Sequence, residues 1–181
     1  MFTFVHIPKN SGTSITQWLE KNFKEPIARN GTGYLHPSLP MLGATEETFA
    51  VVRNPWDRIV SLWSFWTQFE GNQNITFETF VRNLKSYKFE ETAWFTFDQP
   101  QKAWIPDGVT HLLRFETLES DFKVIQERLG CSEPLPHIND TLRDDYHTYY
   151  TDETRDIVAQ VFKDDIETYG FEYQYSTMTN P

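Results

Sequence analysis

The feature that most constrains the fold is a repeated order of short apolar strand, polar break and helix. Three segments rich in apolar or β-branched residues are expected to form buried parallel strands. They are residues 2–7, 49–53 and 111–115. Helical patterns follow them at residues 12–22, 56–69 and 118–129. Strands that alternate with helices predict an α/β fold with a mostly parallel sheet.

Two further helices are predicted, at residues 77–86 and 152–169. Looser stretches interrupt the alternation at residues 24–46 and 131–150. In an open parallel sheet, ligands bind beyond the carboxyl ends of the strands. We therefore expect the functional residues in the loops that leave those ends.

The bulk composition predicts one aromatic-rich domain. The chain has 181 residues, and Phe, Tyr and Trp make up 16% of them. We expect a single domain over residues 1–175 and a short tail over 176–181. The formal net charge of -10 disfavours nucleic acid and other polyanions as partners, unless a local basic pocket overrides it. The one cysteine, Cys131, has no partner for an internal disulfide, and we expect it to be a small buried apolar side chain.

The sequence has no basic start followed by an apolar segment, and no stretch of about 20 apolar residues. We therefore expect a cytoplasmic protein without membrane insertion. A luminal domain of a longer chain would have the same features and stays open, as does the oligomeric state.

The first motif reads FVHIPKNSGTSITQWLE, from Phe4 to Glu20. A strand ends at Ile7, Pro8 turns the chain and a helix begins near Gly12, so small residues lie at a helix N-terminus. Backbone N–H groups and the helix dipole favour an anion there, and the preceding Lys9 adds a positive charge. A Walker A loop has its Lys after the glycines, so ordinary ATP or GTP binding is disfavoured. Taken alone, the motif is also compatible with a capped strand–helix turn.

The second motif, VVRNPWDRIVSLW, begins at the end of the next strand. Arg53 ends that strand, Asn54 and Pro55 turn the chain, and Ser61 lies two turns along the helix. An Arg fork and a Ser hydroxyl are suited to hold one phosphate. Two anion sites suggest a ligand with phosphates at both ends.

With these motifs the chain resembles the sulfotransferases that use the donor PAPS, particularly the branch with the carbohydrate sulfotransferases of the heparan 2-O type. The matching segments are HIPKNSGTS and VRNPWDRIVS, and also LLRFETLESDF, LPHIN and DDYHTYYTDE. The resemblance implies a three-layer α/β sandwich of the P-loop type. It also implies in-line transfer of a sulfuryl group to a hydroxyl or amine of a carbohydrate or small molecule, with PAP as product and no metal.

The resemblance assigns roles to individual residues. Lys9 neutralises the leaving phosphate, and Arg53 and Ser61 hold the 3′-phosphate. Arg143 and Tyr146 are nucleotide contacts in the late loop. The cradle for the 5′-phosphosulfate consists of Asn10, Ser11, Gly12, Thr13 and Ser14.

A general base near the acceptor is expected to be a histidine. Related enzymes place theirs between the two phosphate motifs, where this chain has His36. We predict His36 as the base, and a loop histidine packed near Pro37 is the alternative. His6 is expected to be packed beside the loop, and His137 to order the loop on the nucleotide side.

Other residues are assigned mainly structural roles. Arg58 is expected to pair with a carboxylate such as Asp57 or Glu116. The aromatic side chains that begin at Trp56 are expected to pack in the core. Trp94 and Trp104 are better placed to touch an acceptor.

Two other functions stay open. One is a P-loop nucleotide or small-molecule kinase, although the chain lacks Walker A order and an evident Mg²⁺ carboxylate. The other is a protein that binds PAP or an anionic partner without turnover.

Overall fold

The fold is described from a computed structural model. The structure describes residues 2–23, 28–29, 47–69, 71–87, 97–136 and 143–174. The chain forms two compact units, each with its own core. Unit 1 consists of residues 1–53 and 101–140, and unit 2 consists of residues 54–100 and 141–181. The expectation of one domain over residues 1–175 stays a prediction.

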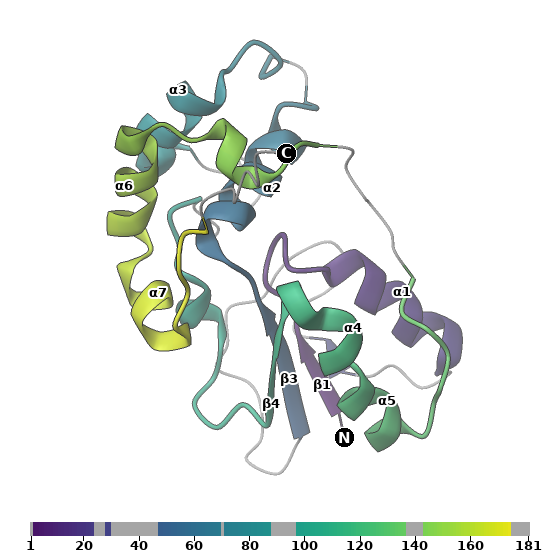
Figure 1. Cartoon of the computed structure of the whole chain (residues 1–181). Helices are drawn as coiled ribbons and strands as arrows, with labels where there is room; N and C mark the ends of the chain where they lie inside the picture. The colour runs from purple at the N-terminus through teal and green to yellow at the C-terminus, as the bar shows by residue number, and fades with distance from the viewer. Residues whose placement is uncertain are drawn as a thin grey trace, which may run out of the picture. The chain divides into compact units, whose positions relative to one another are not determined.

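Unit 1 is built on a parallel sheet with the strand order β2-β1-β3-β4. The strands are β1 (Phe2–Val5), β2 (Ala28–Arg29), β3 (Glu47–Val52) and β4 (His111–Arg114). All three neighbouring pairs are parallel, so the carboxyl ends of the strands meet at one edge. Figure 1 shows β1, β3 and β4 side by side. The predicted strands are confirmed to within two residues, but β2 was not predicted.

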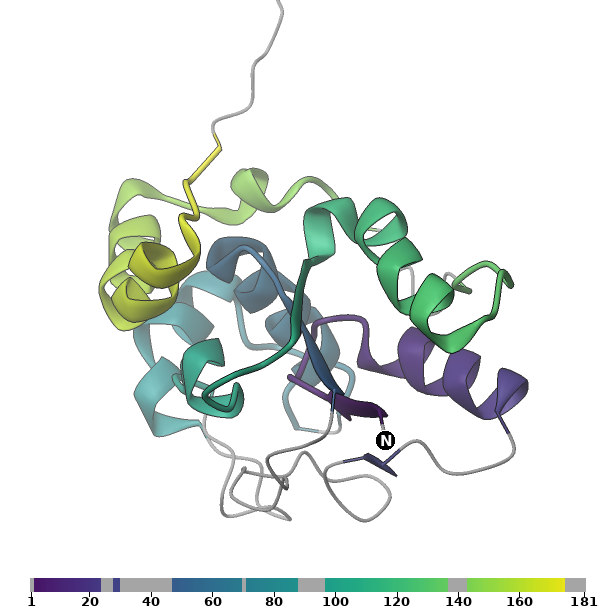
Figure 2. The ribbon, with the colours of Figure 1, turned by 90° about the horizontal axis from the view of Figure 1, so that it is seen from below.

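Helices cover one face of this sheet, as Figure 2 shows for α1 (Gly12–Asn22), α4 (Leu118–Asp121) and α5 (Lys123–Leu129). Phe4 stacks on Phe49 in the sheet at a centroid distance of 4.9 Å. Trp18 of α1 meets Phe122 edge to face at 5.0 Å. Such aromatic pairs contribute roughly 0.5–1.5 kcal/mol each beyond their buried area. The high aromatic content therefore builds the core between helices and sheet.

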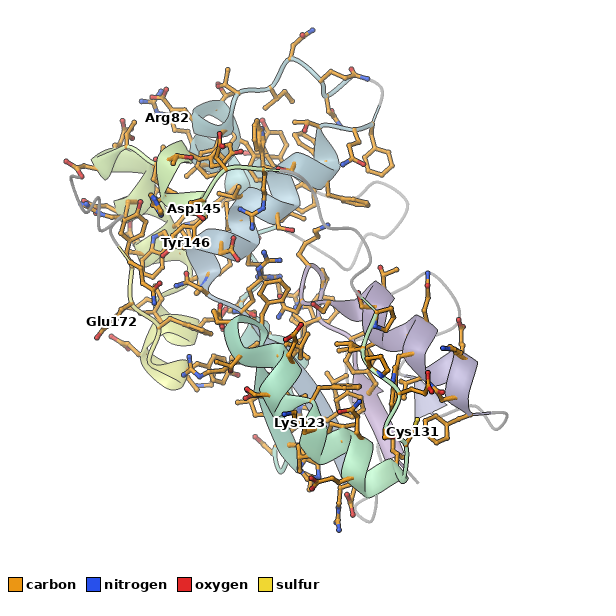
Figure 3. All side chains as sticks on the ribbon, turned by 45° about the vertical axis from the view of Figure 1, so that its right-hand side comes forward. Arg82, Lys123, Cys131, Asp145, Tyr146 and Glu172 are labelled. Carbon is orange, nitrogen blue, oxygen red and sulfur yellow. The ribbon has the colours of Figure 1, made fainter. Side chains whose placement is uncertain are left out.

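Cys131 lies just beyond α5, and Figure 3 shows it with Lys123 at the other end of that helix. Its side chain is only partly buried, although it packs against the core cluster. The side chain that was expected to be buried is therefore half-buried, where the left-handed Gly130 ends the helix. Short 3-10 turns complete unit 1, at η2 (Gln101–Trp104) and η3 (Phe115–Thr117).

Unit 2 is helical. Its helices are α2 (Pro55–Trp66), α3 (Phe77–Arg82), α6 (Asp152–Val161) and α7 (Lys163–Tyr169), with turns η1 (Leu84–Ser86) and η4 (Tyr146–Tyr149). Helix α2 lies beside α3 and α6 (Figure 1). Three predicted helices are each broken in two, at Phe122 in unit 1 and at Asn83 and Phe162 in unit 2. No helix in the described ranges is both long enough and apolar enough to cross a membrane.

The aromatic residues of α2 confirm the core prediction in part. Trp56 is buried, and Trp66 packs against Phe80 at a centroid distance of 5.4 Å. Phe65 and Phe69 are exposed and pair with each other edge to face. Phe65 lies in the last turn of α2, whereas Phe69 follows the helix, which ends at Trp66, three residues before the expected end.

Candidate phosphate-binding site

The loop between β1 and α1 has an unusual backbone. Asn10 N–H donates to the Ile7 carbonyl at 3.3 Å, which closes a turn. Lys9 and Ser11, on either side of Asn10, have positive φ angles of 68° and 59°. They are the only non-glycine residues with positive φ in the described part of the chain. This left-handed conformation costs about 1–2 kcal/mol for each L-residue and is concentrated at functional sites.

Gly12 is required in this loop because of His6. A Cβ atom at Gly12 would lie 1.6 Å from Nε2 of the His6 ring. The ring also stacks on Phe4 at a centroid distance of 5.6 Å, so it is held from two sides. This arrangement agrees with the prediction that His6 is packed beside the loop. It also explains why a histidine and a glycine occur together in the motif.

The N-terminus of α1 differs from those of the other long helices. Its N-cap residue, Ser11, makes no side-chain cap hydrogen bond. Asn54 caps α2 and Thr151 caps α6, each by accepting from a backbone N–H group. The first N–H groups of a helix have no partner within the helix, so they attract an anion. The partly buried Lys9 precedes them and adds its charge. The loop thus combines the features of an anion site.

Arg53 follows β3 and contacts the loop directly. Its Nη1 donates to the Lys9 carbonyl at 2.8 Å, and its guanidinium lies over the Phe115 ring at 3.7 Å. The side chain is buried, with 6% of its surface exposed. Within unit 1 the structure therefore brings the predicted loop and the predicted Arg together.

Gln101 is a residue of this site that sequence reasoning missed. Its side chain is completely buried and bonds to both the N–H and the carbonyl of Arg53, at 2.9 and 2.8 Å. Asn10 Nδ2 donates to Gln101 Oε1 at 2.6 Å and to the Val51 carbonyl at 2.7 Å. The two side-chain donors of Asn10 are thus used within the protein. A lone Gln in an irregular segment carries no pattern that could have predicted this network.

Three predicted site residues lie in unit 2. Ser61 lies on α2, one turn beyond Asp57, and Asp57 forms an ion pair with Arg143. Residues four apart on a helix share a face, so this pair holds Arg143 beside the face that carries Ser61. Tyr146 lies on η4, as Figure 3 shows. Its hydroxyl accepts from the backbone N–H of Gln174 at 2.9 Å.

Tyr146 belongs to an aromatic cluster with Tyr150 and Tyr173, whose ring centroids lie within 6.5 Å of its own. Burial raises the pKa of Tyr150 well above its ordinary value, and the nearby Tyr173 and Asp57 add to the effect. The neutral phenol donates to the Trp56 carbonyl at 2.9 Å. Tyr150 is therefore a fixed hydrogen-bond donor that anchors the η4 segment.

Arg58 has a structural role, as expected. It is buried, donates to the Gln99 carbonyl at 3.3 Å and lies 5.8 Å from the Phe162 ring centroid. Asp57, one of the carboxylates expected beside it, forms an ion pair with Arg143. The pairing of Arg58 with a carboxylate stays a prediction. The placement of Trp104 near an acceptor was wrong, because this side chain is 1% exposed and lies inside unit 1.

His36, His137 and Trp94 lie outside the described residues. Among the described residues, no three His, Cys, Asp or Glu side chains gather as a metal centre requires. The expectation of metal-free chemistry stays a prediction.

A solved structure has a similar fold. The match is to the crystal structure of mouse sulfotransferase SULT7A1 complexed with PAP, with a TM-score of 0.59 and 14% sequence identity. It covers 92% of this chain and 83% of that chain. The α/β fold of the P-loop-like sulfotransferase type is therefore confirmed.

The family follows from the sequence as a whole. The model of the sulfotransferase family matches residues 2–172, and the chain belongs to that family. An uncharacterized protein of Archaeoglobus fulgidus is 28% identical over 99 residues, which are 54% of this chain and 80% of that protein. The narrower resemblance to the heparan 2-O branch stays a prediction.

Proposed function

We propose that this protein transfers a sulfuryl group from PAPS to a hydroxyl or amine of a carbohydrate or small-molecule acceptor and releases PAP. One observation carries the proposal: the loop before α1, with its left-handed Lys9 and Ser11 and without a side-chain cap at Ser11, is hydrogen-bonded to Arg53 through the Lys9 carbonyl. A strained, cation-bearing loop bonded to a second cation suits a nucleotide with two anionic ends.

The loop is proposed to hold the 5′ end of the donor. The N–H groups from Ser11 to Ser14 form the cradle, and Asn10 anchors it through its buried amide. PAPS supplies the activated sulfuryl group when it is bound. Lys9 holds its charge where the leaving phosphate oxygen becomes negative, which is where preorganised charge lowers a barrier most.

Arg53 and Ser61 are proposed to bind the 3′-phosphate, as the resemblance implies. Arg143 and Tyr146 are proposed as further nucleotide contacts. Their support is that Arg143 is held at Asp57, on the helix that also carries Ser61. A guanidinium makes paired hydrogen bonds to phosphate, which favours Arg for such a role.

His36 is proposed as the general base. In the reaction the acceptor oxygen or nitrogen forms a bond to sulfur while the bond from sulfur to the PAP phosphate breaks. The acceptor proton passes to His36, because a neutral imidazole is an effective general base at physiological pH. With a net charge of -10, a neutral glycan or small hydroxylated molecule is favoured over a highly sulfated chain as acceptor.

The test combines donor binding with turnover. Differential scanning fluorimetry is expected to show a higher melting temperature with PAP and little change with ATP and Mg²⁺. A higher melting temperature with ATP than with PAP would overturn the proposal in favour of a kinase.

Radiolabelled sulfate transfer from PAPS to a panel of neutral glycans and hydroxylated metabolites measures the activity itself. We expect a labelled product that requires Lys9 and His36, measured with Lys9→Ala and His36→Ala. Binding of PAP without a product from any acceptor would instead support a protein that binds PAP without turnover.

A further inference from the structure

The side chain of Gln101 links the two cationic parts of the phosphate site. It is the first residue of η2 and has no exposed surface. Its Oε1 accepts from the Arg53 N–H at 2.9 Å and from Asn10 Nδ2 at 2.6 Å, while its Nε2 donates to the Arg53 carbonyl at 2.8 Å. One buried amide thus fixes the end of β3 and the loop at the same time.

Two other bonds complete this network. Asn10 Nδ2 also donates to the Val51 carbonyl at 2.7 Å, and Arg53 Nη1 donates to the Lys9 carbonyl at 2.8 Å. Two successive loop residues, Asn10 and Lys9, are therefore joined to Val51 in β3 and to Arg53 just beyond it. Because buried hydrogen bonds are short and directional, the network sets both the distance and the angle between loop and strand end.

We propose that Gln101 is a positioning residue that sets the spacing between the phosphate loop and Arg53, so that a single bisphosphate nucleotide engages both. This inference rests on the proposed function. A ligand with two phosphates gains from the second site only when the site lies at the distance that the ligand spans. A ligand with one phosphate is insensitive to that distance. The role therefore predicts a selective loss of bisphosphate affinity.

The variant Gln101→Met tests this role. It keeps nearly the same volume and removes the amide that makes these three hydrogen bonds. Gln101→Asn is the conservative variant, because it keeps an uncharged amide with one acceptor and one donor group, on a side chain that is shorter by one methylene. If Gln101→Met does not fold, Gln101→Asn provides the same test, because the shorter side chain cannot hold the loop and Arg53 at the same spacing.

The chain offers a matched control at the other end of β3. Thr48 is buried, and its Oγ1 accepts from the Thr110 N–H at 3.1 Å. Thr48→Val removes a buried hydrogen bond from the same strand, far along the sheet from its carboxyl edge. It is expected to lower the melting temperature without changing the selectivity between ligands.

The experiment is calorimetric titration of the wild-type chain and the three variants with PAP, 5′-AMP and 3′-AMP. In the wild type we expect PAP to bind about 100-fold or more tightly than either monophosphate. In Gln101→Met this ratio should fall by about tenfold or more, with an intermediate fall in Gln101→Asn, while 5′-AMP binding stays within about threefold.

If the Gln101 variants lose affinity for PAP and for 5′-AMP equally, Gln101 only supports the fold. The same conclusion follows if Thr48→Val lowers the ratio of PAP affinity to 5′-AMP affinity by a similar factor. Failure of the wild-type chain to bind PAP would overturn the proposed function, and with it this inference. Wild-type PAP binding with an unchanged ratio in the Gln101 variants would overturn this inference alone.

Discussion

The N-termini of helices α1 and α6 differ in whether the N-cap side chain accepts a hydrogen bond from the first turn of the helix. At α6, Thr151 accepts from the Thr154 N–H at 3.2 Å, and the Thr154 hydroxyl accepts from the Thr151 N–H at 2.9 Å. This capping box satisfies the helix end from within the chain. At α1, Ser11 is left-handed and its side chain makes no cap bond.

The difference shows which helix end is built for stability and which for a ligand. A side-chain cap stabilises a helix by about 1 kcal/mol, and the N-cap residue of α1, Ser11, makes no such bond. The left-handed Lys9 and Ser11 add a further cost of about 1–2 kcal/mol each. An anion that binds at α1 would offset both costs. The comparison therefore predicts that changes at α1 alter binding, whereas changes at α6 alter stability only.

The largest effect is expected for Lys9→Ala. Removing one preorganised charge from a reacting centre typically lowers the rate by about 10²–10³-fold, and we expect a loss of that size in kcat for sulfate transfer. Lys21→Ala, in the last turn of α1, is the matched control, because Lys21 forms an exposed ion pair with Glu133. If Lys9→Ala keeps wild-type kcat, the catalytic role of Lys9 is excluded.

The next largest effect is expected for Gly12→Ala, because the new Cβ atom would collide with the His6 ring. Forcing extra volume into a packed site costs about 1–3 kcal/mol, and the displaced loop should lose most of its affinity for PAP. Gly130→Ala is the control. Its strain comes from a φ of 64° with open space around it, so it should lower stability and leave PAP affinity unchanged. Both are measured by chemical denaturation and PAP titration. Equal PAP affinity in the Gly12→Ala and Gly130→Ala variants would contradict the assignment of the loop before α1 as the PAP site.

Ser11→Gly tests the left-handed conformation at the N-terminus of α1. Glycine adopts the left-handed conformation without strain, so the folded loop should be as stable as the wild type or up to about 1 kcal/mol more stable. The freer loop must then be ordered by the ligand, and PAP affinity should fall a few-fold. The measurement is again denaturation together with titration. A tighter PAP complex would indicate that the left-handed Ser11 opposes binding.

Thr151→Ala should have the smallest effect on function. Loss of this cap should lower the free energy of unfolding by about 1 kcal/mol, as seen by urea denaturation. The affinity for PAP should be unchanged. A parallel loss of PAP affinity would remove the distinction between the two helix ends.

Much of the fold could be predicted because its signals are local. The bounds of α1 match the expected residues 12–22, since a turn with Pro8 precedes Gly12 and the apolar side chains Ile15, Trp18 and Leu19 recur at helical spacing. Strand β2 was missed because it has two residues in a stretch without alternation. The breaks at Phe122 and Phe162 were missed because the apolar spacing continues across them.

The site could be predicted only where it follows a motif. The loop and Arg53 belong to motifs, and their direct contact agrees with the expected pair of anion sites. Gln101 is 48 residues from Arg53 and belongs to no motif, so its bonds depend on the tertiary structure. Trp104 was misjudged because its irregular segment suggested exposure, whereas the η2 turn directs the ring into the core.

A crystal structure of the complex with PAP tests the central claim most directly, namely that the loop from His6 to Ser14 and Arg53 bind one bisphosphate nucleotide. We predict the 5′-phosphate within about 3 Å of Lys9 Nζ and of the backbone nitrogens from Ser11 to Ser14, with the 3′-phosphate on the Arg53 guanidinium. A nucleotide whose phosphates bind elsewhere, with the loop unchanged and empty, would contradict it.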